Sequence, residues 1–544
     1  MKILVRDPIN QVGLEFLKKA GFTVFVWPED FDNVLRECDG LIVRASGKKV
    51  DEALLQKALN LKVIGLASTG HDSIDLEAAT RAGVVVLGQP DNKDIDAAKH
   101  GNFISVAEHT MGMVLALSKN MGLADQAMKN GEFPKKELGP IGQELFEKTL
   151  GIIGLGRIGK LVAFRAQAFG MKIIAYDQYL SEKEIAEAGK IGVFLTDLDT
   201  LLSSSDYLTL HVPKNAETVN MISVHEFNRM KSGVILVNCA RGGIVNEKAL
   251  LTALEREIVC RAGLDVFTEE PPQSEILQKL IRHPRVLATP HTAGPTKESL
   301  RRFSEDVAYG IVKYLKEGIL VHPLNAYSIP EMRFREIEPY RNLGKILAKT
   351  LLQLWGMDKT EFQKIIIRYH GKILTTDEAK VVTGSLLKEV LRTMGYSANY
   401  INARYLCENK YGIVIKEEFI ENDAPEYSFL LEIKMVADEK VKKICGTILG
   451  KRGARIVEID DYALEARPSD KMLIIENKDM PGVIGKIGTL LGQNSVNIAH
   501  FHLGRVEGTN RALAIINVDN EIPEKVLEEL QAIEWIKNVS LINL

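Results

Sequence analysis

Short apolar runs and amphipathic stretches alternate along the first three hundred residues. In residues 1 to about 100 this pattern predicts a small α/β domain with a parallel sheet. An apolar-periodic helix from residue 104 to about 121 should lead into a second alternating region. The expected strands of the first domain are residues 2–5, 23–26, 40–43, 62–66 and 84–87.

The second region opens with an apolar strand at residues 150–153, a glycine-rich turn and an amphipathic helix. The turn reads Gly154-Leu-Gly156-Arg-Ile-Gly159. These glycines allow a tight turn, close approach of a pyrophosphate and close helix packing, and the helix N-terminus offers free N–H groups to the phosphates. The next strand ends at Asp177, whose carboxylate suits ribose hydroxyls and would repel a 2′-phosphate. We therefore predict a Rossmann-type site for NAD rather than NADP.

The same glycine turn has a rival interpretation. The spacing from Gly154 to Lys160 also fits a P-loop, but Leu161 stands where that motif needs Ser or Thr to hold magnesium. A nucleoside triphosphate site is therefore not favoured.

Four further apolar runs in this region end in polar or special residues. In an open parallel sheet, ligands bind beyond the carboxyl ends of the strands, so these side chains should gather at one crevice. The residues expected there are Asp177, His211, Arg241, Asp265 and His291.

Three of these side chains suit the chemistry of a 2-hydroxy or 2-oxo acid. His291 is the natural proton carrier, because imidazole titrates near neutrality. Glu270 is the candidate that orients this imidazole, and Arg241 offers a planar fork for a carboxylate. Each has a structural alternative: a hydrogen-bonded core histidine, a solvated glutamate, and an arginine paired at a domain interface. Cys239 is interpreted as a packing residue.

The remainder of the chain divides into two more units. A helix over residues 338–355 begins a mixed α+β domain without a catalytic constellation, extending to about residue 461. The last stretch alternates as strand, helix, strand, strand, helix, strand, which is the ferredoxin-like order.

Composition limits the class of protein. A chain of 544 residues suggests three or four domains, and 46% hydrophobic with 26% charged residues is ordinary for a globular protein. A net charge of −3 gives no reason to bind nucleic acid or a membrane surface. Five scattered cysteines favour neither disulfides nor a zinc site, and no metal is expected. With no signal peptide and no spanning apolar run, we expect a cytoplasmic protein.

Four motifs together resemble the D-isomer-specific 2-hydroxyacid dehydrogenases, in the long form that adds an intervening domain and a C-terminal ACT domain. They are Gly154–Gly159, Asn238-Cys-Ala-Arg-Gly-Gly243, Leu264-Asp-Val-Phe-Thr-Glu-Glu-Pro-Pro272 and Thr289-Pro-His291. The resemblance implies a Rossmann-type doubly wound sheet, a flavodoxin-like substrate domain, an α+β intervening domain and a ferredoxin-like ACT domain. The implied domains are 1–100 with 293–326 for substrate, 101–292 for NAD, 327–466 as the intervening domain and 470–544 as the regulatory domain.

The resemblance also implies roles for individual residues. Arg241, Glu270 and His291 form the catalytic set. The cofactor site is expected to contain Gly154, Gly156, Arg157, Ile158, Gly159, Asp177, His211, Val212, Pro213, Cys239, Ala240, Asp265, His291 and Gly294. The substrate is expected at Arg44, at Ser68, Thr69 and Gly70, and at Lys135 from a neighbouring subunit, and the effector at Asn477, Asp479 and Asn497.

The implied reaction is NAD-dependent oxidation of 3-phospho-D-glycerate to 3-phosphohydroxypyruvate, the first step of L-serine biosynthesis. L-Serine is the expected effector of a homodimer or homotetramer. Two departures bear on the substrate: Leu66 stands where many phosphoglycerate-oxidising relatives carry a basic residue, and the loop 89–102 is longer and different. The alternatives are another D-2-hydroxyacid dehydrogenase, of glycerate, glyoxylate or lactate type, or an NAD-dependent amino-acid sensor.

Overall fold

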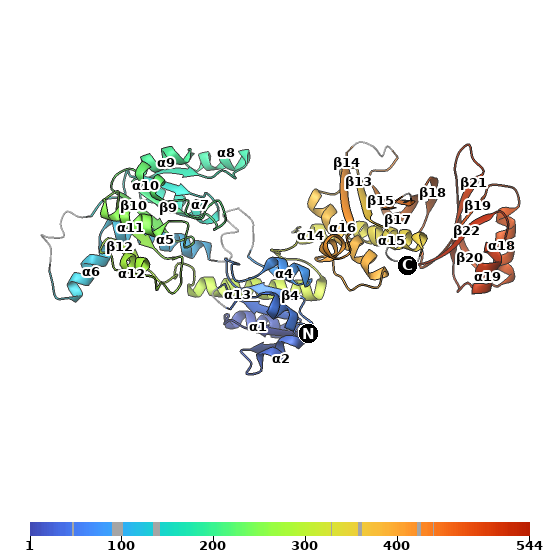
Figure 1. Cartoon of the computed structure of the whole chain (residues 1–544), viewed down its shortest axis with the longest axis horizontal. Helices are drawn as coiled ribbons and strands as arrows, with labels where there is room; N and C mark the ends of the chain where they lie inside the picture. Colours follow the sequence, from blue (N-terminus) through green and yellow to red (C-terminus); the bar gives the residue numbers. More distant parts are fainter. Residues whose placement is uncertain are drawn as a thin grey trace.

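A computed structural model describes residues 1–45, 48–89, 102–133, 142–327, 329–356, 362–421, 426–438 and 440–544. The described strands form three sheets of 5, 7 and 10 strands. Figure 1 shows the 7-stranded sheet at one end of an elongated molecule and the last strands of the 10-stranded sheet at the other end. No helix in these ranges is both long and apolar enough to cross a bilayer.

The first sheet is parallel, in the order β2-β1-β3-β4-β5, which is the flavodoxin-like order. Its strands are β1 (Lys2–Val5), β2 (Thr23–Val26), β3 (Gly40–Val43), β4 (Val63–Leu66) and β5 (Val85–Leu87). Its helices are α1 (Gln11–Lys19), α2 (Phe31–Glu37), α3 (Glu52–Lys57) and α4 (Leu76–Arg81).

A helix from much later in the chain completes this unit. The helix α13 (Lys297–Glu317) lies against α1 and β4. The contact is close because small residues face it: a Cβ on Gly13 would lie 2.6 Å from the Ser304 carbonyl oxygen, and one on Gly65 would lie 2.5 Å from Val307. The chain therefore returns to its first sheet after building the second.

The second sheet is parallel, in the order β12-β11-β10-β9-β6-β7-β8. The order reverses between β6 and β9, which is where a doubly wound sheet opens a crevice for a dinucleotide. Its strands are β6 (Thr149–Ile153), β7 (Lys172–Tyr176), β8 (Val193–Leu195), β9 (Tyr207–Leu210), β10 (Val234–Asn238), β11 (Val259–Leu264) and β12 (Val286–Ala288). Its helices are α5 (Phe103–Ser118), α6 (Met121–Lys129), α7 (Arg157–Ala168), α8 (Glu182–Lys190), α9 (Leu198–Ser204), α10 (Val224–Arg229), α11 (Glu247–Glu255) and α12 (Glu275–Ile281).

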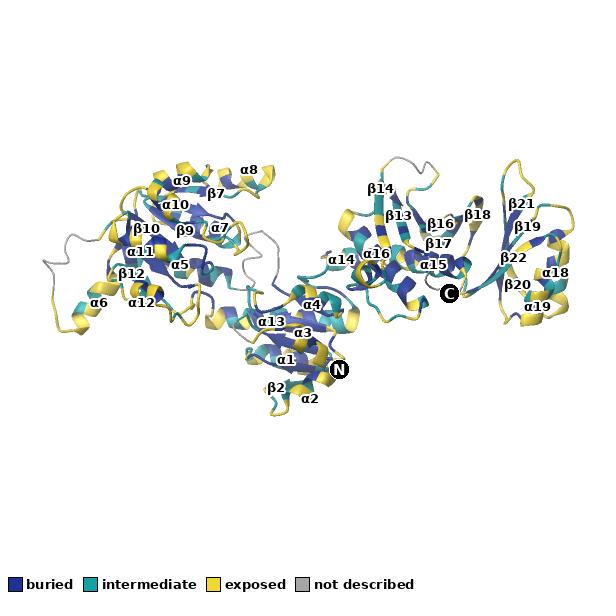
Figure 2. Cartoon of the chain, viewed as in Figure 1, coloured by how far each residue is buried: buried dark blue, intermediate teal, exposed yellow. Residues whose placement is uncertain are grey.

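Burial follows this architecture. The central strands β6, β9 and β10 are almost entirely buried, whereas α6 has no buried residue (Figure 2). The helix expected from 104 to about 121 corresponds to α5, which ends at Ser118, whereas the helix α6 that follows it was not expected. Between the two helices Asn120 adopts a left-handed conformation, with φ 54°.

The third sheet begins with a mixed α+β unit. Its strands are β13 (Lys364–His370), β14 (Val414–Ile420), β15 (Leu430–Ala437), β16 (Lys440–Ile448), β17 (Ala454–Ile459) and β18 (Tyr462–Ala466). Its helices are α14 (Glu331–Glu336), α15 (Glu338–Trp355), α16 (Thr376–Thr393) and the short α17 (Ala403–Tyr405). The helices α15 and α16 pack on each other over a core that includes Leu347, Leu386 and Ile433.

The C-terminal unit has the ferredoxin-like topology expected for an ACT domain. Its strand order β20-β21-β19-β22 is antiparallel throughout. The elements are β19 (Lys471–Lys478), α18 (Val483–Gln493), β20 (Ile498–Arg505), β21 (Arg511–Val518), α19 (Glu524–Gln531) and β22 (Ile536–Asn543).

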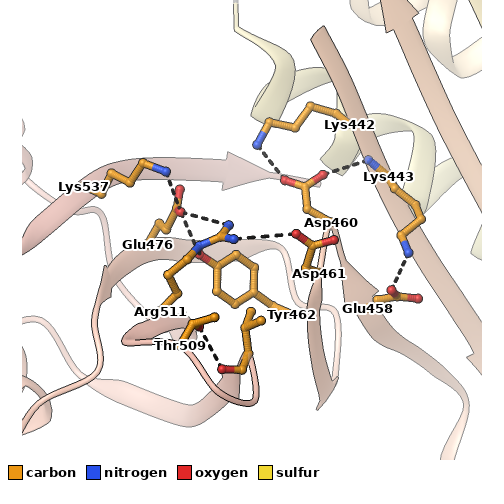
Figure 3. Close-up of polar contacts among 11 residues, drawn as sticks. Lys442, Lys443, Glu458, Asp460, Asp461, Tyr462, Glu476, Thr509, Arg511 and Lys537 are labelled. Atoms are coloured by element: carbon orange, nitrogen blue, oxygen red, sulfur yellow. Dashed lines mark hydrogen bonds and ion pairs between the residues drawn. The ribbon is translucent and has the colours of Figure 1, made fainter. Parts of the chain in front are cut away.

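The two C-terminal units were expected to be separate, but their strands join into one 10-stranded sheet. The strands β18 and β20 are joined by a single bridge, between Ala463 and Arg505. Beside this bridge, Tyr462 donates a hydrogen bond to Glu476 Oε1 at 2.7 Å and accepts one from Arg511 Nε at 3.1 Å. Lys537 Nζ binds the same carboxylate at 2.9 Å (Figure 3). A polar cluster therefore holds the β17–β18 hairpin against the ACT sheet.

Candidate active site

The glycine turn after β6 is shaped for a close ligand. Gly154 has φ 91° and a Cβ there would lie 2.7 Å from the His211 carbonyl oxygen, while a Cβ on Gly159 would lie 2.2 Å from the Gly154 carbonyl oxygen. Gly156 differs, because a Cβ there would meet no described protein atom within 4 Å. Backbone packing therefore explains two of the three glycines, and Gly156 leaves open space at the start of α7.

The start of α7 fits a dinucleotide diphosphate. Its N-cap is Gly156, which provides no side-chain cap, so the first backbone N–H groups are available to an anion. Asp177 follows β7, and its two oxygens accept hydrogen bonds from the backbone N–H groups of Leu155 at 2.9 Å and Tyr179 at 3.0 Å. The turn and the acidic strand end are thus linked to each other. Arg157 stacks on the Phe103 ring at 4.0 Å, and Ile158 packs against the apolar core below the sheet.

The segment after β9 forms the other side of the crevice. Val212 lies against Gly154, and the Pro213 carbonyl accepts a hydrogen bond from Thr218 at 2.6 Å. His211 is partly exposed as a residue, but its Nδ1 is buried without a partner in the described structure. Burial lowers the pKa of this imidazole, so His211 is neutral at physiological pH.

The segment after β10 carries Cys239, Ala240 and Arg241. The Cys239 thiol is buried against Met113 at 3.7 Å, and burial raises its pKa to about 12. Such a thiol is no nucleophile at neutral pH. The Ala240 carbonyl accepts a hydrogen bond from Arg241 Nη1 at 2.8 Å, which directs the guanidinium.

His291 and Glu270 form a hydrogen-bonded pair. His291 Nδ1 lies 2.7 Å from Glu270 Oε2, and the other carboxylate oxygen accepts a hydrogen bond from the Phe267 N–H at 3.1 Å. The hydrogen bond to Glu270 raises the pKa of His291 above its usual value, against the opposing effect of burial. Burial acts to raise the pKa of Glu270, but the hydrogen bonds from His291 and Phe267 outweigh it and lower that pKa. The pair therefore favours a protonated imidazole beside an ionised carboxylate.

An apolar cavity borders this pair. Its volume is about 440 Å³, and its walls include Phe267, Pro272, Ile281 and Ala288 as well as His291 and Glu270. The imidazole is about half exposed. Its Nε2 is thus the ring nitrogen left for a substrate hydroxyl, since Nδ1 faces Glu270.

Asp265 is completely buried, and both of its carboxylate oxygens accept hydrogen bonds from the segment that carries His291. Its Oδ1 accepts hydrogen bonds from Thr289 Oγ1 at 2.5 Å and from the Thr292 N–H at 2.8 Å, and its Oδ2 accepts one from the Ala293 N–H at 3.0 Å. The His291 N–H donates to the Asp265 carbonyl at 2.9 Å. We expected Asp265 to line the cofactor site. The geometry makes it a positioning residue for the residues on either side of His291.

Arg241 reaches across to the first sheet. Its Nε lies 3.3 Å from Asp72 Oδ2, and a Cβ on Gly70 would lie 2.5 Å from its Nη2. The expected substrate loop is held in place by its own contacts: Ser68 Oγ accepts from the Ala45 N–H at 2.8 Å, and Thr69 Oγ1 donates to Asn102 Oδ1 at 2.5 Å. The structure thus brings the proposed carboxylate-binding arginine to the loop 68–70.

Several residues at this site were not predicted from the sequence. Asp72 pairs with Arg241, and Asn102 bridges Thr69 and Gly294, since a Cβ on Gly294 would lie 2.4 Å from Asn102 Nδ2. His109 Nε2 lies 3.2 Å from Thr289 Oγ1. These contacts join positions far apart in the chain, so no local sequence pattern predicts them. Of the other expected substrate residues, Arg44 follows β3, and Lys135 lies outside the described residues.

The three expected effector residues do not meet within one chain. Asn477 is buried at the carboxyl end of β19, where it aligns with Ala512 of β21. Ile498, next to Asn497, aligns with Val518 at the other end of β21. Six residues of strand span roughly 20 Å. Asp479 lies near Asn477 and pairs with Arg505 at 3.3 Å, whereas Asn497 Nδ2 donates to Asp519 at 2.5 Å.

The two parallel sheets, the glycine turn and the polar side chains at the strand ends define an NAD-binding dehydrogenase of the D-isomer-specific 2-hydroxyacid class. Residues 111–293 match the family described as "D-isomer specific 2-hydroxyacid dehydrogenase, NAD binding domain". Residues 336–460 match the "D-3-phosphoglycerate dehydrogenase intervening domain", and residues 471–534 match the ACT domain.

Similar full-length proteins identify the family more narrowly. It is 36% identical to D-3-phosphoglycerate dehydrogenase of Methanocaldococcus jannaschii, over 100% of both chains. It is 34% identical to that of Bacillus subtilis, over 100% of this chain and 99% of the other. The chain therefore belongs to the D-3-phosphoglycerate dehydrogenase family.

Two solved structures each cover about three fifths of this chain. The apo D-lactate dehydrogenase from Escherichia coli is 27% identical, with a TM-score of 0.51 over 60% of this chain and 100% of that one. An NAD-dependent formate dehydrogenase from Staphylococcus aureus in complex with NAD is 30% identical, with a TM-score of 0.50 over 59% of this chain and 97% of that one.

Proposed function

We propose that this protein oxidises 3-phospho-D-glycerate to 3-phosphohydroxypyruvate with NAD, as the first step of L-serine biosynthesis. The observation that carries the proposal is the hydrogen-bonded pair of His291 and Glu270 at the carboxyl edge of the Rossmann-type sheet. It is supported by full-length similarity to relatives named for this activity.

The proposed division of labour follows from the geometry. His291 Nε2 takes the proton of the substrate hydroxyl, while Glu270 holds the Nδ1–H and stabilises the imidazolium that forms. Arg241 binds the carboxylate of the substrate with the guanidinium edge that faces the loop 68–70. The turn at Gly154–Gly159 and the carboxylate of Asp177 would hold NAD. When bound, its nicotinamide would accept the hydride. His211 is neutral and therefore adds no positive charge beside the nicotinamide.

A substrate panel tests this proposal. Initial rates of NADH formation are measured with 3-phospho-D-glycerate, D-glycerate, D-lactate and glyoxylate's reduced form, glycolate. We expect kcat/KM for 3-phospho-D-glycerate to exceed the others by at least about 100-fold, because a phosphate adds charge-assisted hydrogen bonds. Equal or greater activity with an unphosphorylated acid would assign the enzyme to another substrate of the same family.

We also propose that L-serine binds the ACT domain at a site shared by two chains. Asn477 Oδ1 is buried without a partner in the described structure, and Asp479 lies nearby, so an amino acid would find both an acceptor and a carboxylate. Asn497 would come from the second chain, because it lies at the opposite end of the sheet. Isothermal titration with L-serine should give a saturable heat that Asp479→Ala removes. No heat with the unaltered protein would refute this assignment.

We propose a homodimer or homotetramer, because the serine site would need two chains and because an exposed helix carries apolar side chains. The helix α6 extends from the body and exposes Met121, Leu123 and Met128 (Figure 2). Light scattering should give at least twice the chain mass of 60.5 kDa. A monomer at micromolar concentration would contradict the proposal.

We also propose a cytoplasmic location. All five cysteines are free thiols, which supports a reducing compartment.

A further inference from the structure

The cofactor crevice has a second carboxylate besides Asp177. Asp177, which is expected to bind the adenosine ribose, follows β7, and Glu217 lies in the turn that follows β9. In the sheet order β9-β6-β7, the strand β6 lies between these two strands, and the glycine turn follows β6. The two carboxylates therefore come from the strands on either side of the turn that is expected to bind the diphosphate.

The side chains next to Asp177 reach across to Glu217. Glu217 Oε2 accepts hydrogen bonds from Tyr179 Oη and from Gln178 Nε2, the latter at 3.4 Å. The Gln178 amide is oriented by Tyr176, whose hydroxyl donates to Gln178 Oε1 at 3.3 Å. These contacts hold the Glu217 carboxylate beside the two residues that follow Asp177.

The turn that carries Glu217 is held in place by its own hydrogen bonds. Asn215 Oδ1 accepts from the Glu217 N–H at 2.9 Å and from the Thr218 N–H at 3.0 Å. The basic residue of this turn, Lys214, is directed elsewhere: its Nζ lies 3.3 Å from the position of a Cβ on Gly243. Gly243 follows β10, which neighbours β9 on the side opposite β6 and β7. The nearest cation of the turn is therefore directed away from Asp177.

Both carboxylates keep their negative charge without a cation beside them. In the part of the chain that the structure describes, their hydrogen-bond partners are neutral. Asp177 accepts from the backbone N–H groups of Leu155 and Tyr179, and Glu217 accepts from the side chains of Gln178 and Tyr179. Two charges of the same sign therefore lie at the adenosine end of the crevice.

A phosphate on the 2′-oxygen of the ribose would be disfavoured by this arrangement. A Rossmann-type site that accepts NADP has a basic side chain near this position to bind the 2′-phosphate. Here the donors that follow Asp177, Gln178 Nε2 and Tyr179 Oη, already donate to Glu217. The 2′-phosphate would therefore find these donors occupied and would be repelled by a second negative charge, whereas the ribose hydroxyls of NAD carry no charge.

We propose that Glu217 is a second determinant of cofactor choice, which excludes NADP together with Asp177. Gln178 and Tyr179 position its carboxylate. Asp177 serves NAD by accepting from the ribose, whereas Glu217 acts only against the phosphorylated cofactor. The inference concerns the cofactor alone, so it does not depend on which 2-hydroxy acid the enzyme oxidises.

Binding of NADH and NADPH without substrate tests this inference. Dissociation constants are measured from nicotinamide fluorescence for the unaltered protein and for Glu217→Gln, which removes the charge but keeps an oxygen that can accept from Tyr179. The ratio of the Kd for NADPH to the Kd for NADH should fall by about 3- to 30-fold in Glu217→Gln, because one of two like charges near the phosphate is gone. The Kd for NADH should change by less than about 3-fold.

Further variants separate the charge from its surroundings. Tyr179→Phe removes one hydrogen bond but no charge, so the ratio should change by less than about 3-fold. Glu255→Gln removes an exposed carboxylate at the end of α11, just before β11 begins, and should leave the ratio unchanged. Asp177→Asn combined with Glu217→Gln should lower the ratio further than either substitution alone.

Three results would overturn the inference. The first is an unchanged ratio in Glu217→Gln. The second is an equal gain of affinity for NADH and NADPH in that variant, which would make Glu217 a general source of repulsion rather than a selective one. The third is an equal fall of the ratio in Glu255→Gln, which would reflect the net charge of the protein.

An adenosine fragment provides a readout without the nicotinamide. Isothermal titration compares ADP-ribose with its 2′-phosphorylated form. Glu217→Gln should bind the 2′-phosphorylated form about 3- to 30-fold more tightly than the unaltered protein does, and ADP-ribose within about 3-fold. No gain for the 2′-phosphorylated form would contradict the inference. If the unaltered enzyme fails to oxidise 3-phospho-D-glycerate, the proposed substrate falls, and both binding measurements still decide the role of Glu217.

Discussion

The charge state of one imidazole decides the direction in which a proton moves at this site. Oxidation of a hydroxyl needs His291 neutral, so kcat/KM for oxidation should rise as the pH rises through the pKa of His291. Glu270 holds that pKa above its usual value. In Glu270→Gln the rising limb should therefore move to lower pH, while the maximal rate falls by about 10-fold or more because the imidazolium loses its partner.

The pH–rate profile of kcat/KM measures both effects. The reverse reaction needs a protonated His291, so its rate should fall as the pH rises through the same pKa, and Glu270→Gln should shift that limb in the same direction. An unshifted limb, or one displaced to higher pH, would show that Glu270 does not control this imidazole.

Asp265 gives a second prediction at the level of single residues. Asp265→Asn keeps the shape of the side chain but places an NH₂ group against an N–H donor, that of Ala293 or of Thr292. One buried donor is left unpaired, which should lower the free energy of unfolding by about 1–3 kcal/mol. Chemical denaturation measures this change. Asp51→Asn, at the exposed N-cap of α3, is the matched control and should cost less than about 0.5 kcal/mol.

Strand ends carry most of the chemistry in this fold, and they are also what the sequence predicts best. The strands of the first sheet, the glycine turn and the ferredoxin-like order follow from local apolar patterns and turn chemistry. The separate helix α6 does not, because Asn120 interrupts a helical period that continues on both sides. Nor does the bridge from β18 to β20, which depends on packing between two units.

Some residues of the active site could likewise be predicted from the sequence, and others could not. His291 and Arg241 could be predicted because each follows a recognisable strand. The contact of Arg241 with Asp72 spans 169 positions. A single sequence contains no local signal for this contact.

The open space at Gly156 gives a prediction for the glycine turn. Gly156→Ala adds a methyl group that meets no described protein atom, so stability without cofactor should fall by no more than about 1 kcal/mol, the usual cost of an alanine at a helix N-cap. The same methyl group would occupy the path of the pyrophosphate, so the dissociation constant for NAD should rise by about 10-fold or more.

Cofactor titration by fluorescence measures this affinity. Gly189→Ala in α8 is the control, since its Cβ is also unobstructed and Gly189 is not part of the glycine turn. That variant should bind NAD normally and gain up to about 1 kcal/mol of stability. Normal NAD binding by Gly156→Ala would place the diphosphate elsewhere.

At the scale of the whole molecule, the polar cluster around Glu476 joins the intervening unit to the ACT sheet (Figure 3). Burial alone would raise the pKa of Glu476, but the hydrogen bonds from Tyr462 and Lys537 lower it. A carboxyl with a depressed pKa in the folded state stabilises that state above its unfolded pKa and loses the effect as the pH falls. The joint should therefore hold at neutral pH and loosen only in acid.

Hydrogen exchange can follow this joint directly. Glu476→Gln should accelerate amide exchange in β18 and β20 at neutral pH by about 10-fold or more, with β6 unchanged. Glu524→Gln, at the exposed start of α19, should leave all three strands unaffected. Equal exchange in β18 and β20 for both variants would show that the cluster does not hold the two units together.

One measurement tests the proposed active site most directly. NADH formation from 3-phospho-D-glycerate is followed in the unaltered protein and in His291→Ala, with NAD binding measured in both. We predict that kcat falls by about 100- to 10,000-fold in His291→Ala while NAD affinity stays within about 3-fold. NADH formation at an undiminished rate in His291→Ala would contradict the assignment of this imidazole as the proton acceptor.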